Sequence, residues 1–167
     1  MRSTLTAAIT ALMLTGLAAT SHAQDLGGYL TAGSGAIDYL VVRDAIPQIS
    51  GGVLVRFADD RVRVGAQADV FFSNGYVSGR GGPLAEIALL STRHRVQPFA
   101  TGGYYFGEGG GLVMYGGGVD LWMTDQVGIR AAVQDAVRHL SFISPFDFGR
   151  SSAFSHEPSV QFGVVWR

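Results

Sequence analysis

The chain of 167 residues contains no cysteine, and only 15% of its residues are charged, where a soluble domain carries about 25%. All of its 12 basic residues are arginine, and the formal net charge of -1 gives no electrostatic basis for nucleic-acid binding, which needs a basic patch. Without cysteine there is no disulfide, no thiolate metal ligand, no cysteine nucleophile and no lipid-carrying cysteine.

Residues 1–23 have the features of a secretory signal peptide. Arg2 gives a short positive region, Leu5 to Ala19 is uncharged, and Ser21-His22-Ala23 is a small-x-small cleavage signal. The uncharged stretch is shorter than the ~20 residues that a membrane anchor, the alternative, requires. We therefore predict a signal peptide at 1–23 and a barrel domain at 24–167.

The remaining chain offers no segment for a transmembrane helix. Its longest uncharged runs, Leu26 to Ile37 and Val96 to Gly107, have 12 residues each and are interrupted by glycines or Pro98. A bilayer admits only helices and closed barrels, because every backbone polar group must be hydrogen-bonded there. An exported chain of low charge without spanning helices is therefore a candidate for a membrane barrel.

Residues alternate with the period of a β-strand along much of the chain. The clearest segment is Arg61 to Phe72, where every second residue from Val62 onward is apolar. The same alternation predicts further strands at 48–57, 127–138 and 159–166, and weaker patterns predict strands at 27–37, 83–90, 97–106 and 112–123. In 83–90 and 97–106 both faces are apolar or small, so the pattern leaves the outward face of these two strands open.

The predicted connections alternate between two kinds. Short polar connections are predicted at 58–60, 91–95 and 124–126, and mostly longer ones at 38–47, 73–82, 107–111 and 139–155, the last three rich in Gly, Ser or aromatic residues. Tight periplasmic turns and longer extracellular loops are typical of an up-and-down membrane barrel. We therefore predict an all-β, eight-stranded, antiparallel up-and-down transmembrane β-barrel with its termini on the periplasmic side.

The polar face of the strands indicates which side meets lipid. A soluble barrel, such as a lipocalin, would fill that face with Lys and Glu, whereas here it is rich in glycine and has no lysine. The apolar face is therefore predicted to contact lipid, and the polar face to fill the narrow interior. We expect the inward charges to pair with one another, with a proton or ion path as the alternative; they are Arg56, Arg63, Asp69, Glu86, Asp120 and Arg130.

Three segments carry a family resemblance. They are Pro98 to Tyr105, Gly116 to Arg130 and the final strand Val160 to Arg167. Their order and spacing resemble the small outer-membrane β-barrel family, which includes the transmembrane domain of outer membrane protein A. The resemblance implies an outer-membrane location, contact with membrane lipid and lipopolysaccharide, and recognition of the last strand by the outer-membrane assembly machinery. Trp166 departs from the family pattern because it is penultimate and Arg167 follows it.

Several aromatic residues lie near predicted strand ends. We expect them to form girdles at the membrane interface, with a binding surface as the alternative; they are Tyr104, Tyr105, Trp122, Phe162 and Trp166. The apolar segment 139–155 is expected to fold over the barrel mouth or to contact lipopolysaccharide headgroups, and the alternative is an extracellular ligand at these loops.

One constellation suggests catalysis. His139 and Ser141, with Glu157 across the predicted loop, could supply a base, a nucleophile and an orienting group. The His-x-Ser pair resembles that of outer-membrane lipid A deacylases, whose motif continues with Asn where this chain has Phe142. Because His139 also closes an ordinary strand, we predict a non-catalytic protein with a structural or surface-interaction role; a lipid A-modifying hydrolase and a narrow passive pore are the alternatives.

No cofactor or metal is predicted. The glycine runs at 109–111 and 116–118 lack the Lys and Ser/Thr of a phosphate-binding loop. His94 stands between two arginines and has no neighbouring metal ligands in the sequence.

Overall fold

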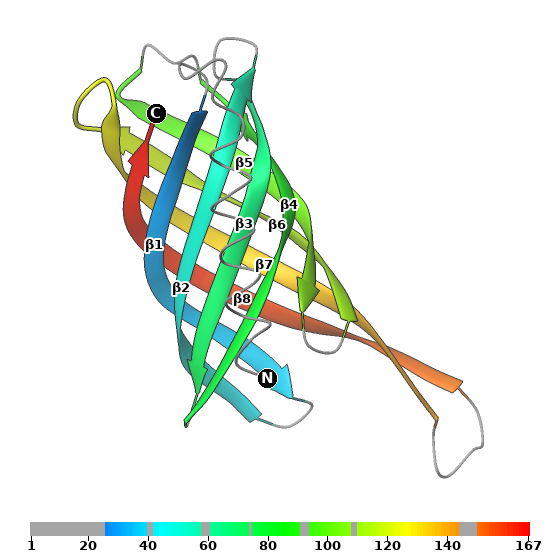
Figure 1. Ribbon diagram of the computed structural model, residues 1–167. Helices are drawn as coiled ribbons and strands as arrows, with labels where there is room; N and C mark the ends of the chain where they lie inside the picture. The colour runs from blue at the N-terminus through cyan, green and yellow to red at the C-terminus, as the bar shows by residue number, and fades with distance from the viewer. Residues whose placement is uncertain are drawn as a thin grey trace.

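In the computed structural model, eight antiparallel strands form one closed barrel (Figure 1). The structure describes residues 26–39, 42–57, 61–73, 75–90, 94–107, 110–143 and 150–167, and of 37–39, 42–44, 140–143 and 150–153 it describes the backbone only. The strands are β1 (Leu26–Tyr39), β2 (Val42–Phe57), β3 (Val62–Ser73), β4 (Tyr76–Ala88), β5 (Val96–Gly107), β6 (Gly110–Trp122), β7 (Val127–Ile143) and β8 (Arg150–Trp166). Each strand pairs with the next, and β8 closes against β1. The predicted signal peptide lies outside the described residues.

The alternation seen in the sequence decides which side chains face the interior. On β3, Arg63, Gln67 and Asp69 are buried, whereas Val64 and Phe72 are exposed. The same period operates on all eight strands, so the predicted fold class is confirmed. The structure also settles the two strands whose faces the sequence left open. Leu84, Glu86 and Ala88 face inward on β4, and Gln97, Phe99, Thr101 and Tyr105 face inward on β5.

The strands are longer than predicted at the end of the barrel opposite Leu26 and Trp166, the first residue of β1 and the last residue of β8. The predicted loop 73–82 is wrong, because β3 runs to Ser73, β4 starts at Tyr76, and these two residues pair. Gly75 between them has a φ of 86°, a left-handed conformation that glycine adopts readily in tight hairpins. Most of 38–47 and of 139–155, also predicted as loops, is likewise strand.

Glycine and serine in 73–82 and 139–155 misled the prediction of those two loops for a physical reason. Beyond the closed part of the barrel, Ser73 still pairs with Tyr76, and 138–143 still pair with 150–155, so the ladder of each hairpin continues whatever the side chain is. Composition then gives little information about where a strand ends.

The other end of the barrel carries the start of β1 and the end of β8. The strands are separated there by 58–61, 89–95 and 123–126, whereas at the opposite end three of the four separations, 40–41, 74–75 and 108–109, have two residues each. The predicted contrast between short connections at the terminal end and longer ones at the opposite end is therefore wrong. Gly28 near the start of β1 lies opposite Trp166 near the end of β8. In the β6–β7 turn, Thr124 Oγ1 accepts the backbone N–H groups of Gln126 at 3.2 Å and of Val127 at 3.0 Å. Such a side-chain bond stabilises a tight turn, which agrees with the short connection predicted at 124–126.

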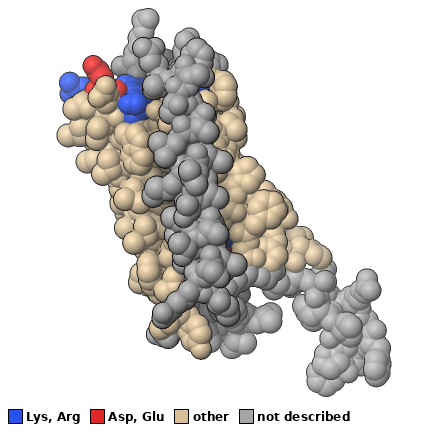
Figure 2. Space-filling view, viewed as in Figure 1, with Lys and Arg blue, Asp and Glu red and all other residues tan. Residues whose placement is uncertain are grey.

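The outer wall of the barrel is apolar. Ile129 and Val133 on β7 and Phe162 on β8 are 50%, 59% and 61% exposed. On the face shown in Figure 2, charged side chains gather at the end of the barrel that carries the termini and are almost absent from the described wall. The described residues contain no helix that is long and apolar enough to cross a membrane.

The β7–β8 hairpin projects beyond the rest of the barrel (Figure 1). Pairing of β7 with β6 extends to Val137, and pairing of β8 with β1 extends to Ser159, while β7 and β8 stay paired as far as Ile143 and Arg150. Pro158 is the first residue of β8 beyond the pairing with β1. Proline lacks a backbone N–H and suits a position where a ladder ends.

We predict that Gly33→Ala destabilises the junction of β1 and β8. A Cβ at Gly33 would lie 1.9 Å from the carbonyl oxygen of Val160, so the backbones must separate, at a cost of about 1–3 kcal/mol. The temperature at which the folded form is lost on an unboiled gel should fall. Gly51→Ala is the matched control, because its added Cβ would meet Leu30 at an ordinary 3.7 Å; equal midpoints for the two variants would contradict the prediction.

Candidate functional site

A four-residue charge cluster lies inside the barrel, towards the end that carries the termini. Arg130 Nε lies 2.8 Å from Asp120 Oδ1, and Arg130 Nη1 lies 2.8 Å from Glu86 Oε1. Arg63 Nη1 lies 2.7 Å from Asp120 Oδ2 and 3.4 Å from Glu86 Oε2. All four residues are at most 2% exposed. Two arginines thus share two carboxylates, and the buried charges neutralise one another.

The strand register brings these four residues together. Arg63 is paired with Glu86 across β3 and β4, and Asp120 is paired with Arg130 across β6 and β7. Since each pair faces inward, the narrow interior places the two pairs against each other. The structure therefore assembles four of the six inward charges singled out in the sequence.

Aromatic rings and an amide enclose this cluster. The Arg130 guanidinium lies 4.3 Å from the ring centres of both Tyr29 and Phe99. Gln97 Oε1 accepts hydrogen bonds from Arg63 Nη2 at 2.5 Å and from Trp122 Nε1 at 3.0 Å. The cluster is therefore held by ion pairs, ring contacts and neutral hydrogen bonds together.

A second charge cluster lies nearer the opposite end. Arg80 Nε lies 2.9 Å from Asp69 Oδ2, and Arg80 Nη1 lies 2.7 Å from Glu157 Oε2. Arg138 Nη2 approaches Glu157 Oε1 at 3.6 Å. Arg80 is not among the predicted interior charges, because residues 73–82 are predicted as a loop. The Asn74-Gly75 dipeptide, a hairpin signal, would have placed Arg80 opposite Asp69.

Glutamines extend the second cluster towards the first. Gln67 Nε2 donates to Asp69 Oδ1 at 2.6 Å, Gln134 Nε2 donates to Gln67 Oε1 at 3.3 Å, and Gln161 Nε2 donates to Gln134 Oε1 at 3.1 Å. The Tyr29 hydroxyl also donates to Gln67. These hydrogen bonds extend from the second cluster to Tyr29, whose ring contacts Arg130 of the first cluster.

A small pocket lies at the end of the barrel that carries the termini. Its volume is about 10 Å³, the space of about one water molecule. Arg56, the half-buried sixth residue of the predicted set, lines it together with Arg63, Trp122 and Arg167. The Arg167 guanidinium also lies 4.2 Å from the Trp122 ring centre.

Two of the five predicted interfacial aromatics face the interior instead. Tyr105 is 0% exposed and Trp122 is 5% exposed, so their predicted place at the lipid interface is wrong. Both residues occupy inward positions of their strands, and the parity of a position decides its face regardless of side-chain type. Tyr104, Phe162 and Trp166 face outward and are 43%, 61% and 43% exposed.

The proposed catalytic residues do not form one constellation. His139 is exposed, with its ring 5.4 Å from that of Phe154, whereas Glu157 is buried in the interior and bound to Arg80. Glu157 therefore cannot orient His139. The backbone of Ser141 belongs to β7, and its side chain lies outside the described positions. Among the residues that the structure describes, no group of three or more His, Asp or Glu could hold a metal ion.

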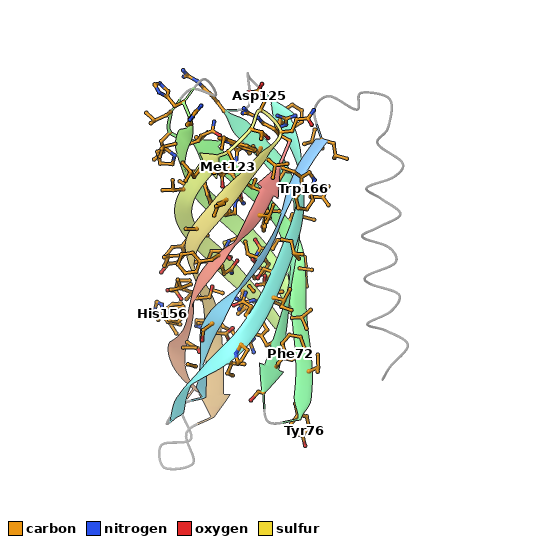
Figure 3. The ribbon with its side chains drawn as sticks, turned by 90° about the vertical axis from the view of Figure 1, so that its left-hand side faces the viewer. Phe72, Tyr76, Met123, Asp125, His156 and Trp166 are labelled. Atoms are coloured by element: carbon orange, nitrogen blue, oxygen red, sulfur yellow. The ribbon has the colours of Figure 1, made fainter. Side chains whose placement is uncertain are left out.

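A polar cluster on the outer wall was not found from the sequence. Asp135 Oδ2 accepts a hydrogen bond from the Tyr115 hydroxyl at 2.8 Å and lies 2.7 Å from His156 Nδ1. His156 lies on the outer side of β8, between the levels of Trp166 and Tyr76 (Figure 3). The sequence did carry one signal, since Asp135 interrupts the outward apolar series that ends at Val133.

We predict that Arg130→Ala destabilises the barrel by about 3–5 kcal/mol, because Glu86 and Asp120 would remain buried with one cation fewer. The measurement is the free energy of unfolding in detergent, from urea titration. Arg61→Ala, at an exposed turn position, is the control and should leave the stability unchanged. Equal stability of the two variants would mean that the interior cluster is solvated.

Comparison with solved structures supports the fold. The barrel is similar to the crystal structure of neisserial surface protein A, with a TM-score of 0.64 and 12% sequence identity, covering 84% of this chain and 96% of that one. The N-terminal β-barrel domain of OprF from Pseudomonas aeruginosa matches with a TM-score of 0.49 and 9% identity, covering 82% of this chain and 96% of that domain. No protein-family model and no curated protein sequence matches the chain. At this identity the similarity to neisserial surface protein A establishes the fold alone, which is a closed eight-stranded antiparallel barrel.

Proposed function

We propose that this chain is an outer-membrane protein with a structural or surface-interaction role and without catalytic activity. The observation that carries the proposal is the combination of an apolar outer wall with a filled, charge-paired interior. On β7 the outward residues from Val127 to Val133 are all apolar. Such a wall suits the apolar band, about 25 Å tall, of an outer-membrane barrel.

The filled interior supports a scaffold and argues against a passive pore. Eight strands enclose a space that side chains just fill, and here ion pairs and glutamines bridge it from wall to wall. A pore would need a continuous water path, whereas the pocket at the terminal end has room for about one water. The buried pairs would have to separate before ions could pass.

The projecting β7–β8 hairpin supports the surface-interaction part of the proposal. With the termini in the periplasm, this hairpin stands on the extracellular side, where it can reach lipopolysaccharide or an extracellular ligand. The outward Phe162 and Trp166 on β8 suit recognition of the last strand by the assembly machinery during insertion. Glu157 is bound to Arg80 in the interior and cannot orient the ring of His139, which argues against the lipid A-modifying hydrolase.

The proposal is tested by cell fractionation with gel mobility. We expect the protein in the outer-membrane fraction, and an unboiled sample in detergent should migrate differently from the boiled one, because the closed barrel resists detergent. Recovery of a folded monomer from the periplasm without detergent would contradict the membrane location.

A recording in planar lipid bilayers tests the closed interior. We expect no steady single-channel conductance, because the two charge clusters and the glutamines obstruct the axis of the barrel. Protein whose folded state has been checked by gel mobility should be used. Reproducible conductance steps from such protein would favour the passive pore.

A further inference from the structure

The Tyr115–Asp135–His156 cluster lies where the proposed function places lipid. Tyr115 is 50% exposed, and the side chain of His156 is 54% exposed, whereas that of Asp135 is 22% exposed. The three residues come from β6, β7 and β8, and all of them face away from the barrel axis. A carboxylate on a lipid-facing wall is costly without partners, and here it has two side-chain partners.

The bonding pattern decides which atom the cluster presents outward. An ionised carboxylate only accepts hydrogen bonds, so His156 Nδ1 carries the proton that lies against Asp135 Oδ2. Nε2 is then the free ring nitrogen, and the described residues supply no hydrogen bond to it. Arg138 and Glu157, which neighbour the cluster in sequence, bind each other on the interior side. Of the two imidazole nitrogens of His156, Nε2 is therefore the one left for a group from outside the cluster.

The position of the cluster along the wall indicates its depth in the membrane. Eight residue steps separate Val127, near the end that carries the termini, from Asp135. At about 3.3 Å per residue these steps cover about 26 Å along the strand, or about 20 Å of membrane depth at a tilt of about 40°. The apolar band is about 25 Å tall, so the cluster lies close to the outer headgroup boundary. Phe154, the next outward residue on β8, is 67% exposed and suits an interfacial girdle.

We propose that this cluster binds the phosphate group of an outer-leaflet lipid. In the protonated form of His156, Nε2–H donates to a phosphate oxygen, Asp135 holds the ring through Nδ1, and Tyr115 holds Asp135. A charge-assisted hydrogen bond of this kind is about twice as strong as a neutral one. The inference rests on the proposed membrane location, because it requires lipid at the outer wall.

When His156 is protonated, a phosphate suits this cluster better than a sugar hydroxyl. A hydroxyl would be expected to donate to the carboxylate, but Asp135 Oδ2 already accepts from two groups, and Oδ1 is buried. The exposed atom is the imidazole nitrogen, which in its protonated form requires an acceptor. In that form the site matches an anionic acceptor, whereas a neutral ring with its proton on Nδ1 would accept a hydrogen bond from a hydroxyl at Nε2.

The test is native mass spectrometry of the purified barrel in maltoside micelles with added phosphatidylglycerol. His156→Gln should weaken retention of this lipid about tenfold, as expected for the loss of one charged hydrogen bond. Tyr115→Phe should weaken it less, because Asp135 keeps its contact with His156. His94→Gln, which removes an exposed imidazole at the opposite end of the barrel, is the control and should bind like the wild type.

Two results would overturn the inference. One is equal retention of phosphatidylglycerol by His156→Gln and by the wild type. The other is retention of diacylglycerol, which lacks the phosphate, as strong as that of phosphatidylglycerol. Gel mobility of each variant separates the two proposals. A detergent-resistant barrel that does not bind the lipid would contradict the phosphate site alone. A chain that folds without detergent would contradict the membrane location as well.

Discussion

The closure of β8 on β1 is the constraint on which the rest of this structure depends. A hydrocarbon environment offers no hydrogen bonds, so each backbone N–H and C=O must find its partner within the protein. Closure satisfies this requirement without regard to side chains, and it sorts every strand into an outward and an inward series. The charged residues of those inward series then face a dry, narrow space. Four of these residues form ion pairs that neutralise their charges, so side chains fill this part of the interior; they are Arg63, Glu86, Asp120 and Arg130.

How far the sequence predicted this molecule follows from the same parity rule. Strong alternation in 61–72 and 127–138 predicted both the strands and their faces, because a strand places successive side chains on opposite sides. The pairing of Arg130 with Asp120 was accessible for the same reason. Residues 73–82 are predicted wrongly because glycine and serine resemble a loop in composition, although the pairing of β3 with β4 holds them in a strand. Because Arg80 lies in this predicted loop, the sequence does not predict the second charge cluster.

The sites were harder to predict than the fold. Tyr105 and Trp122 were judged by residue type, as girdle aromatics, while their inward parity makes them part of the core. Glu157 and His139 looked adjacent across a predicted loop, yet one faces the interior and the other the outside. The contact between Asp135 and His156 depends on the exact pairing of β7 with β8, in which Asp135 is opposite Pro158 and His156 opposite Val137. That register cannot be obtained from either strand alone.

The ring contacts of the interior arginines bear on the absence of lysine from the chain. Arg130 lies between Tyr29 and Phe99, and Arg80 lies 4.7 Å from the ring centre of Phe71 and 4.9 Å from that of Tyr105. A planar guanidinium can bind carboxylates at its edge while its faces stack on aromatic rings; a lysine ammonium is a compact point charge without such faces. Exchange of these arginines for lysine would keep the net charge of the interior but would remove the contacts between the guanidinium groups and the aromatic rings. The choice of cation in this barrel is thus dictated by shape as much as by charge.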